Sequence, residues 1–317
     1  MKNVIKAKQL SLSKQNNNHT QNDSKRQSDC EVARFVSSRI NRLLITIIAI
    51  TSFIYAPASL KAEPVRWLND QGFSSSQQKT VNKWLKFAVD ATQKSFGVLP
   101  FDTIDFRVKH SRRNSEPVPW GQVNRVDNSI LLHISPYYGL TALKDDWTIY
   151  HEVAHLYLPF LDDHDTWLSE GFATYIQHIT MMQANVLSQT QAISRIEAGL
   201  GRGQENMRRA RGSLYRVSDN MHYNRAYMRI YWSGAAYFIE ADLALHQQGK
   251  KLTTIIADYA SCCLTMDGTG KQLVKDLDKL SNTSIFSELY STYRYRRDFP
   301  VIERQALTEL LTSYQVE

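Results

Sequence analysis

The sequence is poor in cysteine, with three cysteines in 317 residues. Cys30 lies in the polar N-terminal segment, whereas Cys262 and Cys263 are neighbours. Because a bond between adjacent cysteines is strained and uncommon, the sequence predicts no disulfide framework. We interpret Cys262 and Cys263 as two small hydrophobic residues of a packed helix, with a redox switch as the alternative.

Most of the chain also lacks net charge. The formal charge is +7, but residues 1–62 contain ten Lys or Arg against three Asp or Glu, and residues 63–317 contain 28 of each kind. The basic isoelectric point therefore comes from the N-terminal segment. A protein without a basic surface has little attraction for phosphate groups, so we expect no nucleic-acid partner.

Long apolar runs are absent apart from residues 43–56, a 14-residue run that follows Arg39 and Arg42 and precedes small residues. The run is shorter than the roughly 20 residues that span a bilayer. It predicts a secretory signal peptide, with an N-terminal membrane anchor and membrane association as the alternative.

We expect a disordered basic leader over residues 1–42, the signal or anchor over 43–62, and one folded domain over 63–317. Export without disulfides fits a bacterial periplasm better than an animal secretory route, with anchoring in the cytoplasmic membrane, facing the periplasm, as the alternative.

Hydrophobic periodicity divides the folded domain into a short strand-rich part and a longer helical part. Residues 74–96 have helical periodicity, alternation predicts strands over 104–108 and 129–134, and helical periods dominate after residue 145. Residues 193–216 contain four glycines and six arginines and are predicted to be a mobile insertion. The fold class is therefore α+β and predominantly helical, with a small N-terminal sheet and a helical C-terminal lobe.

The chemistry of the chain centres on the pentad His151-Glu152-Val153-Ala154-His155. Two histidines four residues apart project from one face of a helix and can bind one cation, with Glu152 beside them as a base. This pattern predicts a catalytic zinc site, which needs a third protein ligand and an open position for water. The favoured third ligand is Glu170, which lies on the next predicted helix. His164 and the aspartates of the intervening loop are the alternatives.

The pentad and the later sequence Trp167-Leu168-Ser169-Glu170-Gly171 together resemble the gluzincin metallopeptidases, which include thermolysin, aminopeptidase N and the glycyl aminopeptidases. The closest likeness is to the short bacterial branch called peptidase MA-like, and it covers residues 146–250 best. The resemblance implies a thermolysin-like two-lobed domain with Glu170 as third zinc ligand and Glu152 as general base. The spacer between His155 and Glu170 has 14 residues, against 18 in the aminopeptidase N branch.

The resemblance also bears on two further residues. Related proteins have Tyr-x-Lys-Gly-Ala after the zinc helices, and Tyr231-Trp232-Ser233-Gly234-Ala235 matches it with serine in place of lysine. This implies that Tyr231 donates to the oxyanion, with a core tyrosine as the alternative and His222 and Tyr223 as fallback donors. Thr174 lies one helical turn after Glu170. Its side chain either supports one of the zinc ligands by a hydrogen bond or is exposed to solvent.

The function expected from the sequence is an exported zinc metallopeptidase that hydrolyses peptide bonds through a metal-activated water, with Glu152 as general base. Its partner is a peptide or protein substrate. The Gly-x-Met-x-Asn strand by which aminopeptidases hold a free amino terminus is missing, which argues against an aminopeptidase. An aminopeptidase is therefore the alternative and not the favoured function. A second alternative is a catalytically silent zinc protein that binds a peptide or protein. The sequence does not indicate an oligomeric state.

The arginines of the predicted insertion form either a solvated face or a lid for an acidic or carboxylate-bearing substrate. They are Arg202, Arg208, Arg209, Arg211 and Arg216.

Overall fold

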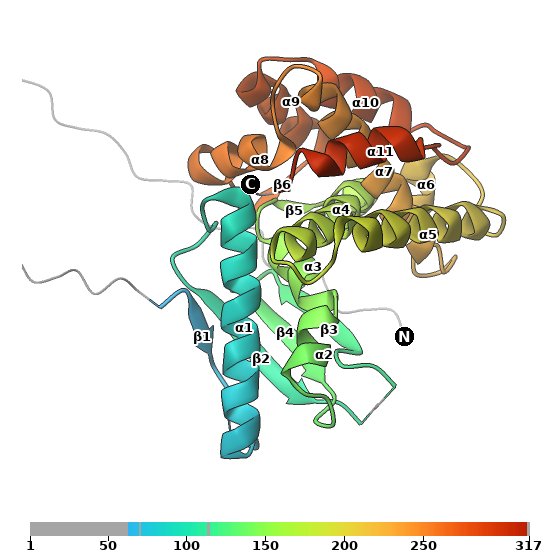
Figure 1. The fold of residues 1–317 in the computed structure, drawn as a ribbon. Helices are drawn as coiled ribbons and strands as arrows, with labels where there is room; N and C mark the ends of the chain where they lie inside the picture. Colours follow the sequence, from blue (N-terminus) through green and yellow to red (C-terminus); the bar gives the residue numbers. More distant parts are fainter. Residues whose placement is uncertain (1–62, 70, 113–114, 316–317) are drawn as a thin grey trace, which may run out of the picture. The chain divides into compact units, whose positions relative to one another are not determined.

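The computed structural model describes residues 63–69, 71–112 and 115–315 (Figure 1). The predicted leader, the predicted signal or anchor, and Cys30 lie outside these residues, so the predictions made for them stay predictions. Among the helices that the structure describes, none combines the length and the apolar character that a membrane span requires.

A four-stranded sheet comes first in the chain. Its spatial order is β1-β2-β4-β3, with β1 parallel to β2, β2 parallel to β4, and β3 antiparallel to β4. The strands are β1 (Val65–Trp67), β2 (Ile104–His110), β3 (Trp120–Asn124) and β4 (Ser129–Ile134). The alternation that predicted strands over residues 104–108 and 129–134 is confirmed, since it places Ile104, Phe106 and Val108 in the core. In this order β3 is an edge strand.

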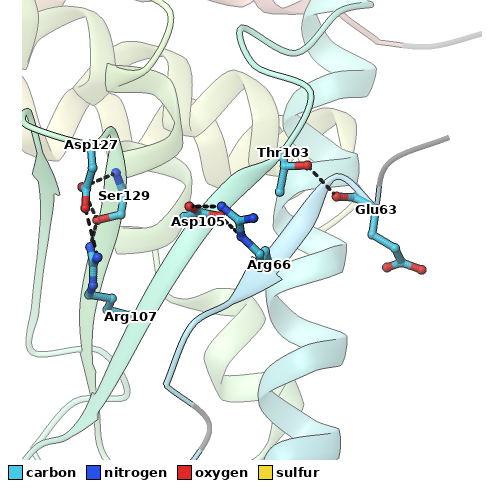
Figure 2. A network of polar contacts seen from close by, with 7 residues as sticks. All are labelled: Glu63, Arg66, Thr103, Asp105, Arg107, Asp127 and Ser129. Atoms are coloured by element: carbon cyan, nitrogen blue, oxygen red, sulfur yellow. Dashed lines mark hydrogen bonds and ion pairs between the residues drawn. The ribbon is translucent and has the colours of Figure 1, made fainter. Parts of the chain in front are cut away.

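Ion pairs on the polar side of the sheet link neighbouring strands (Figure 2). Arg66 and Asp105 are register partners on β1 and β2, and the guanidinium donates two hydrogen bonds of 2.7 and 2.6 Å to the carboxylate. Arg107 on β2 reaches Asp127 at 3.0 Å in the turn between β3 and β4 and also donates to Ser129. Hydrogen bonds from Ser129 and Arg107 lower the pKa of Asp127 to about 2. These contacts hold the register of β1, β2 and β4.

Helix α1 (Ser75–Phe96) covers one face of this sheet and confirms the predicted helix. Ser74 and Gln77 form a capping box at its start, and Gly97 ends it with a left-handed φ of 78°. Its buried stripe includes Trp84 and Leu85, which are fully inaccessible to solvent.

The rest of the chain is almost entirely helical, in agreement with the predicted class of a small sheet followed by helices. In Figure 1, α3 (Thr148–His155) and α4 (Thr166–Gln183) lie between the sheet and the C-terminal helices α8 to α11, which begin at Leu252 and end at Thr312. The elements after the sheet are α2 (Leu140–Asp145), α3 (Thr148–His155), β5 (Phe160–Leu161), the 3₁₀ turn η1 (Asp163–Asp165), α4 (Thr166–Gln183), α5 (Gln189–Met207), α6 (Leu214–Asp219), α7 (Tyr227–His246), α8 (Leu252–Cys262), β6 (Asp267–Gly268), α9 (Gly270–Ser281), α10 (Ile285–Tyr293) and α11 (Arg304–Thr312).

Helix α5 contradicts the prediction of a mobile insertion over residues 193–216. Its start is fixed by a capping box between Ser188 and Gln191, and it packs along α7. The glycines that suggested flexibility are contact residues, because a Cβ on Gly199 would lie 1.9 Å from the Trp232 ring and one on Gly203 would lie 2.6 Å from Phe299. Gly199 and Gly203 stand one helical turn apart, so they form a flat face on which Trp232 rests.

Cys262 and Cys263 also differ from the prediction. They are joined by a disulfide across adjacent residues, and both are exposed rather than packed. The interpretation as two buried hydrophobic residues was wrong because α8 ends at Cys262, so the chain leaves the helical period that buries Ile255, Ile256 and Tyr259.

Helices α4 and α7 approach each other closely. A Cβ on Gly171 would lie 2.1 Å from the backbone of Gly234, and a Cβ on Gly234 would lie 1.9 Å from the Trp167 carbonyl oxygen. Two glycines facing each other thus allow the two backbones to touch. In the sequence, Gly171 directly follows Glu170, and Gly234 lies three residues after Tyr231. The contact between the two helices therefore determines the distance between the side chains of Glu170 and Tyr231.

Candidate metal centre

Helices α3 and α4 bring three potential ligands together. His151 and His155 occupy one face of α3, Glu170 projects from the second turn of α4, and one ligand atom from each lies within 4.8 Å of the others. Both histidines are buried, at 3 and 5% exposure. The preference for Glu170 over the loop residues is thus consistent with the geometry.

The geometry of this cluster fits a tetrahedral zinc ion. Nε2 of His151 lies 3.2 Å from Nε2 of His155 and 3.2 Å from Glu170 Oε2, and the third edge, from His155 Nε2 to Glu170 Oε2, is 3.6 Å. Ligand distances of 2.0–2.1 Å in a tetrahedral site place neighbouring ligand atoms roughly 3.3 Å apart. The three atoms therefore form one face of such a tetrahedron.

The other nitrogen of each imidazole is held by a neighbour on α4. Nδ1 of His151 lies 3.0 Å from Gln177 Oε1, and Nδ1 of His155 lies 3.1 Å from Ser169 Oγ, so both oxygens can accept a hydrogen bond from the ring. With Nδ1 carrying the proton, each Nε2 presents a lone pair to the shared point. Sequence reasoning missed both residues, although Gln177 stands two turns after Glu170 on the same helix face.

We expect Gln177→Leu to weaken zinc binding by about 10- to 100-fold, because His151 loses the acceptor that orients its ring. Gln177→Glu keeps an acceptor at the same position and should retain tight binding. Competition with a chromogenic chelator measures both affinities. Equal losses in the two variants would assign the effect to packing instead of to the hydrogen bond.

Glu152 lies beside the cluster in a nearly closed environment. It is 8% exposed and accepts a hydrogen bond from the backbone of Val123 on β3. Burial raises the pKa of its carboxyl group to about 7, although the charges of His151 and Arg125 act in the opposite direction. A carboxylate with a pKa near the working pH suits a general base.

Arg125 is a third residue that sequence reasoning missed. It follows β3, donates to the His155 carbonyl oxygen at 3.4 Å, and packs on the Phe160 ring at 5.5 Å. Burial lowers the pKa of its guanidinium, and the charges of Glu152 and Glu170 oppose that effect. It therefore balances part of the negative charge of the site.

The three potential ligands have different protonation preferences. Burial lowers the pKa of His155 to about 4, so this ring is neutral at ordinary pH. For His151 burial acts in the same direction, but the facing Glu170 carboxylate outweighs it and raises the pKa. Burial alone would raise the pKa of Glu170, yet the two imidazoles lower it well below its usual range.

These directions predict that zinc affinity falls on acidification. Zinc binds the neutral imidazole, so below the raised pKa of His151 the metal must displace a proton. The apparent affinity should therefore fall about tenfold for each pH unit below that pKa, with one proton released per zinc bound. Calorimetry in two buffers of different ionisation enthalpy measures this proton release, and an affinity that stays constant from pH 8 to pH 5 would contradict the prediction.

Tyr231 reaches this site from α7. Its ring stacks on His151 with a centroid distance of 5.7 Å. Burial, followed by the charges of Glu170 and Glu152, raises the pKa of its hydroxyl, so this group stays protonated and can donate. The stacking on His151 therefore places Tyr231 beside the cluster.

Thr174 differs from the expectation of a solvated side chain, because it is 3% exposed. Its Oγ1 is buried and has no hydrogen-bond partner in the described part of the chain, so it supports no ligand directly. Thr174 faces α5 and α7 at the wall of a cavity next to the cluster.

The remaining candidates lie outside the cluster. His164 contacts the Asp219 carboxylate and stacks on Tyr215, and Asp165 accepts hydrogen bonds from Tyr290 and Gly270. The fallback donors are on an exposed turn, where His222 lies 3.0 Å from the Tyr227 hydroxyl and Tyr223 is 89% exposed.

Comparison with solved structures places this geometry in a known fold. An aminopeptidase N family protein from Idiomarina loihiensis superposes with a TM-score of 0.55 and 14% identity, over 78% of this chain and 46% of that protein. The chain has the fold of the M1 zinc metallopeptidases. The M1 zinc metallopeptidase from Deinococcus radiodurans superposes with a TM-score of 0.50 and 15% identity, over 75% of this chain and 49% of that protein.

A point mutant of a two-domain M1 zinc metallopeptidase bound to L-arginine also superposes with a TM-score of 0.50, at 14% identity, over 75% of this chain and 49% of the other. The chain thus spans about half the length of these M1 structures. No protein-family model and no curated protein matches the sequence.

Proposed function

We propose that the chain is a zinc-dependent peptide hydrolase. The observation that carries this proposal is the triangle of His151, His155 and Glu170, with the buried Glu152 beside it, in an M1 fold. A site that only stored metal would have no use for a base at position 152.

His151 and His155 would hold zinc through Nε2, and Glu170 would hold it through Oε2. When bound, zinc supplies a Lewis acid that polarises the scissile carbonyl and lowers the pKa of the attacking water. Gln177 and Ser169 fix the two rings so that binding requires little reorganisation.

Glu152 acts as the general base. Its carboxylate takes a proton from the attacking water and then donates it to the departing amine, so one group serves both halves of the reaction. Arg125 limits the negative charge around it, and the Val123 backbone holds the carboxylate in place.

Tyr231 donates a hydrogen bond from its hydroxyl group to the oxygen that gains charge as the carbonyl becomes tetrahedral, and it keeps its proton. Its protonated state and its place against His151 suit that role. The lysine that accompanies this tyrosine in related motifs is Ser233 here, so the donor acts without that neighbour.

The substrate lies along β3, between the sheet and the helices, as in a thermolysin-like two-lobed domain. β3 is an edge strand that can pair with an extended peptide, and its backbone already contacts Glu152. Gly121 leaves this approach open, since a Cβ there would lie 2.8 Å from Glu152 Cγ.

We also propose that the chain is exported, through the predicted signal or anchor, to the bacterial periplasm or to the periplasmic face of the cytoplasmic membrane. The exposed Cys262–Cys263 disulfide supports this, because disulfides persist in oxidising compartments and are rare in the cytosol. Fractionation of cells that produce the full chain tests it, and recovery in the cytosol would refute it.

The hydrolase proposal is tested with a peptide library and the full chain. Purified protein, protein stripped of metal by a chelator, and stripped protein given zinc are incubated with the library, and products are identified by mass spectrometry. We expect cleavage in the first and third samples only.

A second library with acetylated N-termini distinguishes an endopeptidase from an aminopeptidase. An endopeptidase cleaves the peptides of both libraries, and an aminopeptidase cleaves only peptides with free N-termini. Zinc binding without cleavage of either library would refute the hydrolase proposal and support the alternative of a catalytically silent zinc protein that binds a peptide or protein.

A further inference from the structure

A cavity of about 420 Å³ opens between α4, α5 and α7. Three of its lining residues contact the ligand His151: Gln177 by a hydrogen bond of 3.0 Å, Tyr231 by stacking at 5.7 Å, and Trp147 edge-on at 5.3 Å. The cavity therefore adjoins the proposed catalytic site. Its volume lies in the range of small-ligand sites and exceeds what one side chain fills.

The charged side chains of this cavity are of one sign. Arg195 and Arg202 line it from α5, seven residues apart and thus on one face of the helix, and no acidic residue lines it in the described part of the chain. Arg195 is neutralised by Asp145, 3.0 Å away. Arg202 forms no ion pair with any described residue and lies over the Trp232 ring, with 5.7 Å between Cζ and the ring centroid.

A second feature points to a ligand in the same cavity. Thr174 lines its wall, is buried to 3% exposure, and carries a hydroxyl without a hydrogen-bond partner among the described residues. A buried hydroxyl left unpaired costs free energy, so this group is available to hydrogen-bond a molecule bound in the cavity. The apolar surface comes from Met228 and from the rings of Trp147, Tyr231 and Trp232.

We propose that this cavity selects peptide substrates that carry a carboxylate, which Arg202 binds as a charge-assisted hydrogen-bonding partner while the aromatic wall packs on the neighbouring apolar atoms. The proposal rests on the proposed peptide hydrolase function and adds a substrate class to it. The carboxylate belongs either to an aspartate or glutamate side chain or to the peptide C-terminus, since the chemistry at Arg202 is the same. Arg202 is then a specificity-determining residue.

The test measures binding separately from cleavage. The full chain carrying Glu152→Gln is immobilised with zinc and incubated with an equimolar random peptide library, and the bound peptides are identified by mass spectrometry. We expect Glu- or Asp-containing peptides to be enriched over matched Gln or Asn peptides by about tenfold or more. A second library with amidated C-termini separates the two sources: enrichment that persists comes from side chains, and enrichment that disappears comes from the C-terminus.

Variants of Arg202 assign the effect to this residue. Arg202→Gln should remove the enrichment, Arg202→Lys should retain part of it, and Arg202→Glu should reverse it in favour of Lys- and Arg-containing peptides. Arg209→Gln removes the same charge from an exposed arginine that does not line the cavity, and should change nothing. Thermal unfolding of each variant verifies that it is folded.

Equal recovery of Glu and Gln peptides would overturn the proposal, and so would an equal effect of Arg202→Gln and Arg209→Gln. Failure of the hydrolase proposal has a different signature: the carboxylate selection persists and depends on Arg202, while the chain with Glu152 intact cleaves no peptide.

Discussion

We expect Glu152→Gln to lower the rate of the proposed peptide hydrolysis by about 10²- to 10⁴-fold while the chain stays folded and keeps its zinc. The amide has nearly the shape of the carboxylate, but it cannot take the proton from the attacking water. Glu152 is buried beside His151, and the carboxylate that acts on it electrostatically is that of the proposed ligand Glu170. Single-turnover cleavage of a peptide from the library, with zinc content measured on the same samples, gives the comparison.

A matched control is Glu205→Gln, which makes the same chemical change on an exposed position of α5 and should leave the rate unchanged. Cleavage by the Glu152→Gln chain at a rate within a few-fold of the parent would remove Glu152 from the mechanism. Loss of zinc from this variant would instead assign Glu152 to metal binding.

The second large effect concerns the α4–α7 contact. Gly234→Ala places a methyl group where the Trp167 carbonyl oxygen lies 1.9 Å away and Gly171 Cα lies 2.7 Å away. These are backbone atoms of a buried helix, so the helices must separate, and we expect a loss of about 3 kcal/mol or more in the free energy of unfolding. In a chain of this size such a loss lowers Tm by about 6 °C or more. The separation also displaces Tyr231 from Glu170, so hydrolysis should fall with stability.

Gly201→Ala is the control for the alanine substitution itself. Gly201 lies within α5, and a Cβ there would meet nothing within 4 Å. Alanine in an open helical position stabilises by about 0.5–1 kcal/mol through backbone entropy and helix propensity. Thermal or denaturant unfolding of both variants measures the difference, and similar Tm values for the two would contradict the close-contact account of α4 and α7.

Several features of the molecule could be read from the sequence because they depend on local periodicity. The i, i+4 spacing places His151 and His155 on one helix face whatever the rest of the chain does. The strand and helix periods around residues 104–108 and 74–96 follow from which side chains must be buried. Glu170 could be favoured because it lies on a helix that returns to the same site.

Other features depend on contacts between segments that the sequence does not bring together. The glycines of α5 suggested mobility, since nothing in the sequence indicates that Trp232, some thirty residues later, packs on them. Gln177 and Thr174 are ordinary polar residues of an apolar helix, and only the fold shows that both line the cavity and that Gln177 also contacts His151. The Cys262–Cys263 disulfide depends on where α8 ends, which no residue pattern marked.

The most direct measurement of the central claim is the zinc content of the purified full chain and of His155→Ala, determined by elemental mass spectrometry after dialysis against zinc-free buffer. The geometry of His151, His155 and Glu170 predicts one zinc per wild-type chain and a loss of most of it in His155→Ala, with peptide cleavage lost in parallel. Wild-type protein without bound zinc, or His155→Ala protein that keeps one equivalent, would contradict the account.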